Sequence, residues 1–154
     1  MGNPITAVAQ IDRVVAASDI VKVSDQDLQW LHSNEPINAQ VRRWLHMGPS
    51  IVVVTRGEQG ASAFLRDGRR IDVTAPKVEV VDTVGAGDAF MAGLIDGLWS
   101  QGCLGAAARD DLDTVSTDII TYVLTRCVGI AAVTVSRAGA NPPTRAELGE
   151  VSES

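Results

Sequence analysis

Apolar residues recur every three or four positions in several parts of the chain, and this spacing predicts amphipathic helices. The segments concerned are 5–18, 24–31, 38–48, 86–100 and 115–132. Ser24, with Asp27 three positions later, is a capping signal that places a helix start there. Asn38 is expected to be the N-cap of the helix that Gly48 ends. The last of the five segments is rich in β-branched residues, which weakens its helical propensity.

Shorter runs with β-branched residues alternate with these helices and predict strands. They are 19–24 (DIVKVS), 50–55 (SIVVVT), two extended pieces within 60–75, and 132–137 (AVTVSR). Asp67-Gly68 joins the two pieces within 60–75 and is a hairpin signal. Thr144 and Glu147 predict a short, capped terminal helix. Strands that alternate with helices indicate one α/β domain over residues 1–154, with a largely parallel sheet flanked by helices.

Composition and charge narrow the class of protein. The chain has 154 residues, of which 45% are hydrophobic and 21% charged, and this argues against disorder. Its net charge of −6 argues against a nucleic-acid partner. No apolar stretch approaches the ~20 residues that span a bilayer, and no signal peptide is visible, so we expect no membrane partner and a cytoplasmic location. Cys103 and Cys127 lack zinc-site spacing and are consistent with a reducing compartment.

The segment VVDTVGAGDAF, residues 80–90, carries the candidate chemistry. Glycines let backbone approach a ligand closely, and a helix start presents unpaired N–H groups with partial positive charge. Gly85, Ala86 and Gly87 are therefore expected to form an anion pocket, most often one for phosphate. Asp88 is interpreted as a general base that takes the proton of a hydroxyl attacking phosphorus. The alternative is that Asp88 only caps the helix and that the glycines form a tight turn.

Residues 82–88, DTVGAGD, resemble the C-terminal signature D-T-x-G-A-G-D of the PfkB (ribokinase-like) carbohydrate kinases. VVVTRGEQGA (52–61) is similar to the T-x-G-x-x-G segment of that family, and AAVTVSRAGANPP (131–143) to its closing R-x-G-A-x-P stretch. SDIVKVSDQDLQWL (18–31) resembles fructokinase-type members. The match covers residues 10–150, but only the C-terminal part of the ribokinase-like fold; the N-terminal part and the lid have no counterpart here.

The resemblance implies ATP-dependent phosphorylation of a sugar hydroxyl, with Mg²⁺ at the phosphates. It aligns Asp88 with the catalytic base and residues 85–87 with the anion hole. Several family members also bind a monovalent cation such as K⁺ beside that hole. The positions that match the nucleotide segment are Thr55, Gly57 and Gly60, with Arg56 as a possible phosphate contact. The positions that match the cation site are Asp82, Val84, Thr134, Arg137 and Gly139.

The chain also departs from the family pattern. The Asn-x-x-Glu motif, which arranges Mg²⁺ and phosphates, is replaced by Ser24-Asp25-Gln26-Asp27, so that Asp27 would act on the metal only indirectly. The part that carries most sugar contacts is not matched, and we expect this chain alone to bind nucleotide weakly and to phosphorylate slowly or not at all. Trp30, Trp44 and Trp99 are interpreted as core or helix-packing residues.

Three hypotheses stay open at this point. The first is a fructokinase-like or related sugar kinase, whose small-molecule partners are a sugar and ATP. The second is a non-catalytic nucleotide-binding or interaction module that keeps the kinase fold. The third is a homo-oligomer in which an exposed sheet edge pairs with another copy.

Overall fold

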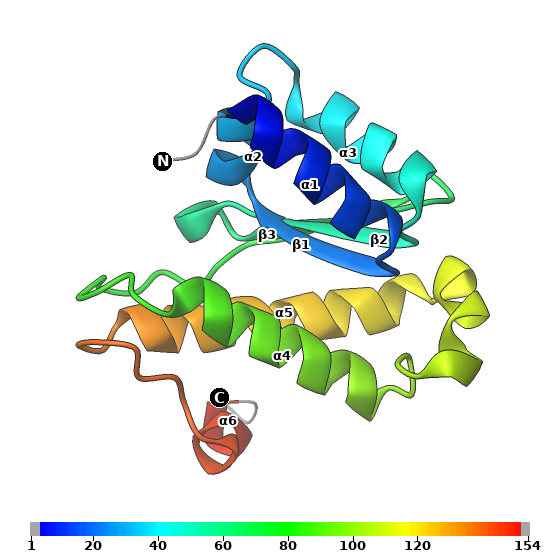
Figure 1. Ribbon diagram of the computed structural model, residues 1–154. Helices are drawn as coiled ribbons and strands as arrows, with labels where there is room; N and C mark the ends of the chain where they lie inside the picture. Colours follow the sequence, from blue (N-terminus) through cyan, green and yellow to red (C-terminus); the bar gives the residue numbers. More distant parts are fainter. Residues whose placement is uncertain (1–3, 152–154) are drawn as a thin grey trace.

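The computed structural model describes residues 4–151 and shows a sheet between two layers of helices (Figure 1). Helices α1, α2 and α3 cover one face of the sheet, and α4 and α5 cover the other. In chain order the elements are α1 (Pro4–Ala16), β1 (Ile20–Ser24), α2 (Asp25–Leu31), α3 (Ile37–Met47), β2 (Ile51–Thr55), β3 (Ala61–Leu65), β4 (Arg70–Val73), α4 (Ala86–Ser100), α5 (Thr117–Val135) and α6 (Arg145–Val151), with short 3₁₀ turns at Gly57–Gln59, Ala106–Ala108 and Asp110–Thr114.

The sheet has four strands in the order β1-β2-β3-β4. β1 and β2 are parallel, with Ile20 opposite Ile51, whereas β2–β3 and β3–β4 are antiparallel. The expectation of a largely parallel sheet is therefore wrong, and the sheet is mixed. The hairpin at Asp67-Gly68 is confirmed, and it supplies two of the four strands, which makes most of the pairing antiparallel.

The strand expected at 132–137 is also wrong, because this stretch is the last turn of α5 and the residues that follow. Its β-branched residues are accommodated in the helix: Thr134 is fully buried, and its hydroxyl donates to the Ile130 carbonyl at 2.8 Å. Burial of the apolar face of α5 against the sheet and α4 outweighs the strand propensity of Val133 and Val135.

The buried face of α5 also explains its composition. By length and hydropathy α5 could cross a membrane, and it is the one helix of that kind between residues 4 and 151. This corrects the expectation that no apolar stretch approaches that length. Its buried residues lie in the core with the sheet and α4, which is the usual position of an apolar helix in an α/β fold.

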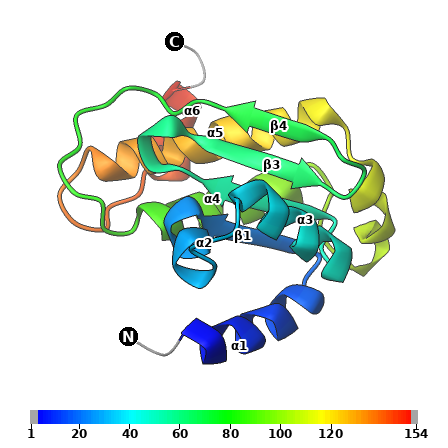
Figure 2. The same ribbon diagram turned by 90° about the horizontal axis from the view of Figure 1, so that it is seen from above.

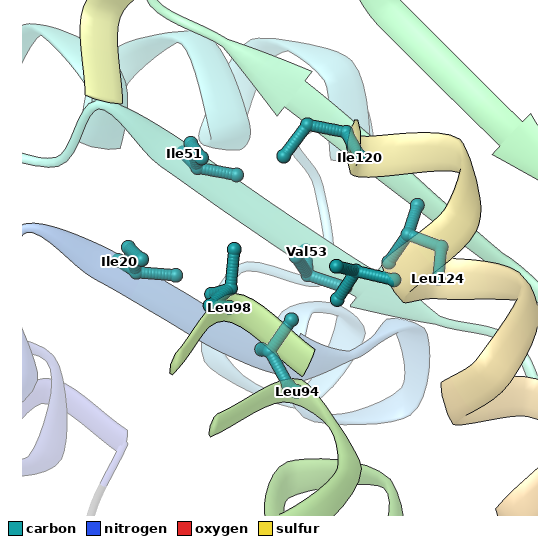
Figure 3. Close-up of a pocket in the computed structure, with 8 residues that line it drawn as sticks. Ile20, Ile51, Val53, Leu94, Leu98, Ile120 and Leu124 are labelled. Atoms are coloured by element: carbon teal, nitrogen blue, oxygen red, sulfur yellow. The ribbon is translucent and has the colours of Figure 1, made fainter. Parts of the chain in front are cut away.

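Two apolar cores form on the two faces of the sheet, since alternate strand residues point to opposite sides. Toward α4 and α5 lie Ile51, Val53 and Leu65 with the buried side chains of both helices, and toward α1–α3 lie Val52, Val54 and Trp44. Figure 3 shows the first core, where strand and helix side chains converge on a void of about 10 Å³. That volume holds at most one water, and its lining is apolar, so it is a packing gap and no ligand site.

The helix starts agree with the sequence in part. Ser24 is the N-cap of α2, and its hydroxyl accepts from the Asp27 N–H at 3.0 Å, as predicted. Asn38 is not a cap, because α3 begins at Ile37 after Pro36, whose carbonyl accepts the first bonds of the helix. Thr144 and Glu147 form the predicted reciprocal cap of α6.

Candidate functional site

The segment 82–88 lies at the carboxyl end of the parallel strands. β1 and β2 end side by side, with Ser24 opposite Thr55. α4 runs back from this edge: Leu98, near its C-terminus, packs beside Ile20 and Ile51 at the strand starts. The N-terminus of α4 therefore lies at the edge where open α/β sheets bind ligands.

Gly85 sets the geometry of this helix start. It is the N-cap of α4 with φ of 79°, the left-handed region that glycine adopts without strain. A Cβ at this position would lie 2.8 Å from the Ala140 Cβ, so the loop from residue 137 to 141 packs closely on the helix start. Glycine is required here for both backbone conformation and space.

Backbone donors are exposed at the helix start. Ala86 N–H donates to the Thr83 carbonyl at 3.3 Å, and Ala89 N–H to Gly85 at 2.8 Å. The N–H groups of Gly87 and Asp88 find no acceptor among residues 4–151. Two free amides at the positive end of a helix make a site for an anion.

The Asp88 carboxylate lies in the first turn of α4 and is exposed to solvent. It forms no ion pair or side-chain hydrogen bond within the described part of the chain, so it does not cap the helix. The interpretation of Asp88 as a cap is therefore wrong. The carboxylate is free to accept a proton from a bound molecule.

Lys22 is a further site residue, which sequence reasoning missed. Its side chain extends from β1, and its Nζ donates to the Gly87 carbonyl at 3.4 Å. The alternation of β1 offers a signal for this position: Lys22 shares the parity of Ile20, which faces α4, and an ammonium next to an apolar core points to a polar partner at its end. The ammonium adds positive charge next to the free amides.

Asp82 joins the segment before α4 to the loop after α5. Its two carboxylate oxygens accept from the Val84 N–H at 2.9 Å and from the Gly139 N–H at 3.0 Å. The hydrogen bond from Val84, and then that from Gly139, hold the pKa of Asp82 below its ordinary value. The N–H groups of Val81 and Asp82 also donate to the Val135 carbonyl.

The five residues matched to a monovalent-cation site therefore lie on two segments that Asp82 holds together. Thr134 lies in the last turn of α5, where its carbonyl accepts from the Arg137 N–H at 3.2 Å. The Arg137 side chain turns away to α6, where it donates to Glu147 at 2.7 Å. Carboxylate and carbonyl oxygens are the donor set that a hard cation takes, although the Thr134 carbonyl also accepts from the Ser136 N–H.

The predicted nucleotide segment follows β2 in a tight turn. Thr55 ends β2 on the face toward α4, since it shares the parity of Ile51 and Val53. Gly57 and Gly60 have φ of 52° and 92°, and a Cβ on Gly60 would lie 2.0 Å from the Val73 carbonyl oxygen. Gly60 thus lets the turn pack on β4, whereas a Cβ on Gly57 would meet no atom within 4 Å.

The Arg56 side chain points away from the candidate anion pocket. Its guanidinium donates to the Ser62 hydroxyl at 2.5 Å and lies 3.7 Å from the Asp72 carboxylate. Ser62 faces the side of the sheet opposite to α4, because Ala61 and Ala63 belong to the α4–α5 core. The structure therefore does not bring Arg56 to the anion pocket.

Asp27 lies on α2, directly after β1, and its carboxylate accepts from the Ser24 hydroxyl at 2.6 Å. It is exposed at the same sheet edge as Thr55. Residues 4–151 contain no group of three or more His, Cys, Asp or Glu that could hold a metal ion. Asp27 could thus contribute one oxygen to a metal whose other ligands come from water or substrate.

A comparison with protein families gives one match over nearly the whole chain. The model of the pfkB family carbohydrate kinases matches residues 2–146. This chain belongs to the pfkB family. The resemblance to this family that residues 82–88 indicated is confirmed.

Known relatives place the chain among fructokinase-like members. It is 47% identical over 90 residues to a fructokinase of Rhizobium leguminosarum bv. trifolii. This alignment covers 58% of this chain and 27% of the Rhizobium protein. The chain is 32% identical over 139 residues to a fructokinase of Klebsiella pneumoniae. This alignment covers 90% of this chain and 42% of the Klebsiella protein.

Among solved structures, a double mutant of the Vibrio cholerae O395 fructokinase with bound fructose, ADP and potassium ion superposes with a TM-score of 0.78. Its sequence identity is 26%, over 97% of this chain and 45% of that one. The chain spans less than half the length of each of these pfkB relatives, and its fold is a corresponding part of the ribokinase-like fold.

Proposed function

We propose that this chain supplies the phosphate-binding and proton-accepting part of an ATP-dependent, fructokinase-like sugar kinase. The observation that carries the proposal is the helix start of α4, where the free N–H groups of Gly87 and Asp88 lie beside the exposed Asp88 carboxylate. Membership of the pfkB family and the similarity to fructokinases support the choice of reaction.

In this proposal the sugar hydroxyl oxygen attacks the γ-phosphorus of ATP, and its proton passes to Asp88. The bond from phosphorus to the β–γ bridging oxygen breaks, and ADP leaves with the electron pair. The amides of Gly87 and Asp88 and the Lys22 ammonium stabilise the negative charge on the transferring group. Thr55, Gly57 and Gly60 would contact the nucleotide from the same sheet edge.

Only a few residues of this chain would bind the metal ions directly. Mg²⁺ would neutralise charge on the phosphates, and Asp27 would hold it from the carboxyl end of β1 through one oxygen or a water. K⁺ would take the Asp82 carboxylate with backbone carbonyls of Val84, Thr134, Arg137 and Gly139. The role of these residues would be to fix the loop against which Gly85 packs.

The experiment has two readouts on the 154-residue chain. Ligand binding to the native state raises its stability, so Mg-ATP at millimolar concentration is expected to raise the melting temperature. A coupled assay of ADP release with fructose is expected to show slow turnover or none, because the acceptor hydroxyl is not held in line by the residues present. Normal turnover would contradict the second expectation.

A second candidate is a nucleotide-binding or interaction module without catalysis. The observation that favours it is the Ser24–Asp27 pair, which forms a helix cap where the family has Asn and Glu. A thermal shift with Mg-ATP but no ADP release in a form with a complete sugar site would support it. The absence of any shift at millimolar nucleotide would overturn both candidates as nucleotide binders.

A further inference from the structure

A groove lies at the end of the sheet opposite to the candidate site. It is formed by the C-terminal part of α3, the end of β3 and the turn that follows β3. Figure 2 shows this turn and the segment 74–85, which leads to α4, at opposite ends of the molecule. β2, with five residues, separates the two ends by about 15 Å. The groove is therefore distinct from the anion pocket.

The size and lining of the groove suit a small molecule. Its volume is about 520 Å³, within the range of roughly 300–1,000 Å³ that is usual for ligand pockets. Leu45, from the core next to α1–α3, and Leu65, from the core next to α4 and α5, both reach it. The half-buried Met47 and the exposed Arg42, His46 and Arg66 also line it. An apolar wall beside cationic side chains fits a ligand with an apolar body and an anionic head.

The charge of Arg66 is already balanced within the chain. Its guanidinium donates to the Gly48 carbonyl, directly after α3, and to the Asp113 carboxylate at 3.1 Å. The first bond satisfies a carbonyl at the partly negative end of α3, and the second pairs the charge. The neighbouring Asp67 is likewise paired, with Arg69 at 2.6 Å. Arg66 therefore offers further N–H donors to a ligand but little net charge.

Arg42 has no such partner. Its side chain forms no ion pair or hydrogen bond with any residue between 4 and 151. Its backbone carbonyl accepts from His46 Nδ1 at 2.6 Å, which orients the imidazole one helical turn away. The permanent positive charge without a counter-ion in the groove is therefore that of Arg42.

We propose that this groove is a second binding site, which takes a small organic monocarboxylate with an apolar body. The planar Arg42 guanidinium matches a carboxylate through two parallel hydrogen bonds, and Arg66 would add a further donor. The apolar body would cover Met47 and the exposed parts of Leu45 and Leu65. One uncompensated charge matches a monoanion better than a dianionic phosphate monoester. This site goes beyond the proposed kinase reaction and does not depend on it.

Octanoate is the probe for the test, which uses the ¹⁵N-labelled 154-residue chain. In an NMR titration we expect saturable shift changes at the N–H groups of Met47, Gly48, Arg66 and Gly68. The N–H groups of Gly87 and Asp88 are expected to be unaffected. Acetate lacks the apolar body and octanol lacks the charge, so each is expected to bind at least about tenfold more weakly.

A matched pair of variants tests the assigned charge. Arg42→Gln is expected to weaken octanoate binding at least about tenfold and to leave the melting temperature close to that of the parent, because the side chain has no partner to lose. Arg13→Gln removes the same charge from an exposed position of α1 whose side chain is also unpaired within residues 4–151. This control is expected to bind octanoate like the parent chain.

Several results would overturn the proposal. They are shift changes confined to other surfaces, no saturation at millimolar octanoate, equal affinity for octanol, or equal losses in Arg42→Gln and Arg13→Gln. Tighter binding of octyl phosphate than of octanoate would overturn the assignment of a monocarboxylate.

The second site and the proposed function can fail separately. Saturating Mg-ATP is expected to leave the affinity for octanoate unchanged, because the two sites lie at opposite ends of β2. Competition between the two ligands would place octanoate in the anion pocket and contradict the proposal. A chain that binds octanoate in the groove but gives no response to Mg-ATP would end the proposed function alone.

Discussion

Two opposite charges lie next to the free amides at the start of α4. Lys22 adds a positive charge within 3.4 Å of the Gly87 carbonyl, whereas the Asp88 carboxylate, in the first turn, repels an anion bound there. A carboxylate at this position is unfavourable for simple phosphate binding but suits proton transfer. The two residues should therefore affect nucleotide affinity in opposite directions.

We expect Lys22→Met to weaken Mg-ATP binding about tenfold, because a charge-assisted contact contributes about 1.5 kcal/mol or more. Asp88→Asn is expected to leave affinity unchanged or to increase it, since it removes repulsion. Isothermal titration calorimetry of the two variants and the parent chain measures both effects. Equal losses in both variants would contradict the assignment of their roles.

Gly60 tests the packing of the nucleotide turn. Gly60→Ala is expected to destabilise the chain by at least about 3 kcal/mol, because a strained backbone is combined with a clash against the Val73 carbonyl. Gly68→Ala has nearly the same φ but no atom within 4 Å of the added methyl, and should cost about 1 kcal/mol. Urea denaturation compares the two; equal losses would show that the contact with β4 is unimportant.

At the scale of elements, the sequence predicted the helices best. The apolar spacing over 86–100 predicts α4 as observed. The caps at Ser24 and Thr144 predict the observed starts of α2 and α6. The end of α5 could not be predicted, because its β-branched residues favour a strand and only contact with the sheet and α4 decides for a helix. The sheet was misjudged as largely parallel for a different reason, because β3 pairs antiparallel with both β2 and β4.

α6 is attached to the loop of the site by Glu147, which accepts from Thr144 and Arg137. The Thr144 N–H, followed by Arg137, lowers the pKa of Glu147 to about 2 from its ordinary 4.5. A lowered pKa stabilises the folded state above pH 4.5, and the contribution disappears as the pH falls toward 2.

We therefore expect Glu147→Gln to be less stable than the parent chain at pH 6, with a difference that shrinks between pH 4.5 and 2. Thermal unfolding followed by circular dichroism over this range measures the difference. Glu58→Gln, at an exposed residue of the turn after β2, serves as the control. A difference between Glu147→Gln and parent that stays constant down to pH 2 would contradict the role of Glu147.

At the scale of the whole molecule, the sheet is covered on both faces, and its outer strands β1 and β4 each pair on one side only within residues 4–151. The signature at 82–88 allowed the anion pocket and Asp88 to be proposed from sequence, because those residues are contiguous. The contact of Lys22 with Gly87, the orientation of Arg56 and the exposure of Trp99, which was interpreted as a packing residue, could not be predicted, because each depends on how the elements are assembled. The outer position of β1 and the exposure of Ile95 and Trp99 on α4 became visible only once the elements were assembled.

The central claim is that the amides at the start of α4 bind the phosphates of a nucleotide. Titration of the ¹⁵N-labelled chain with Mg-ATP, followed by NMR, tests it at single residues. We predict the largest shift changes at the N–H groups of Gly87 and Asp88, with further changes at Thr55 and Gly57. Shift changes confined to other surfaces, or none at millimolar Mg-ATP, would contradict the account.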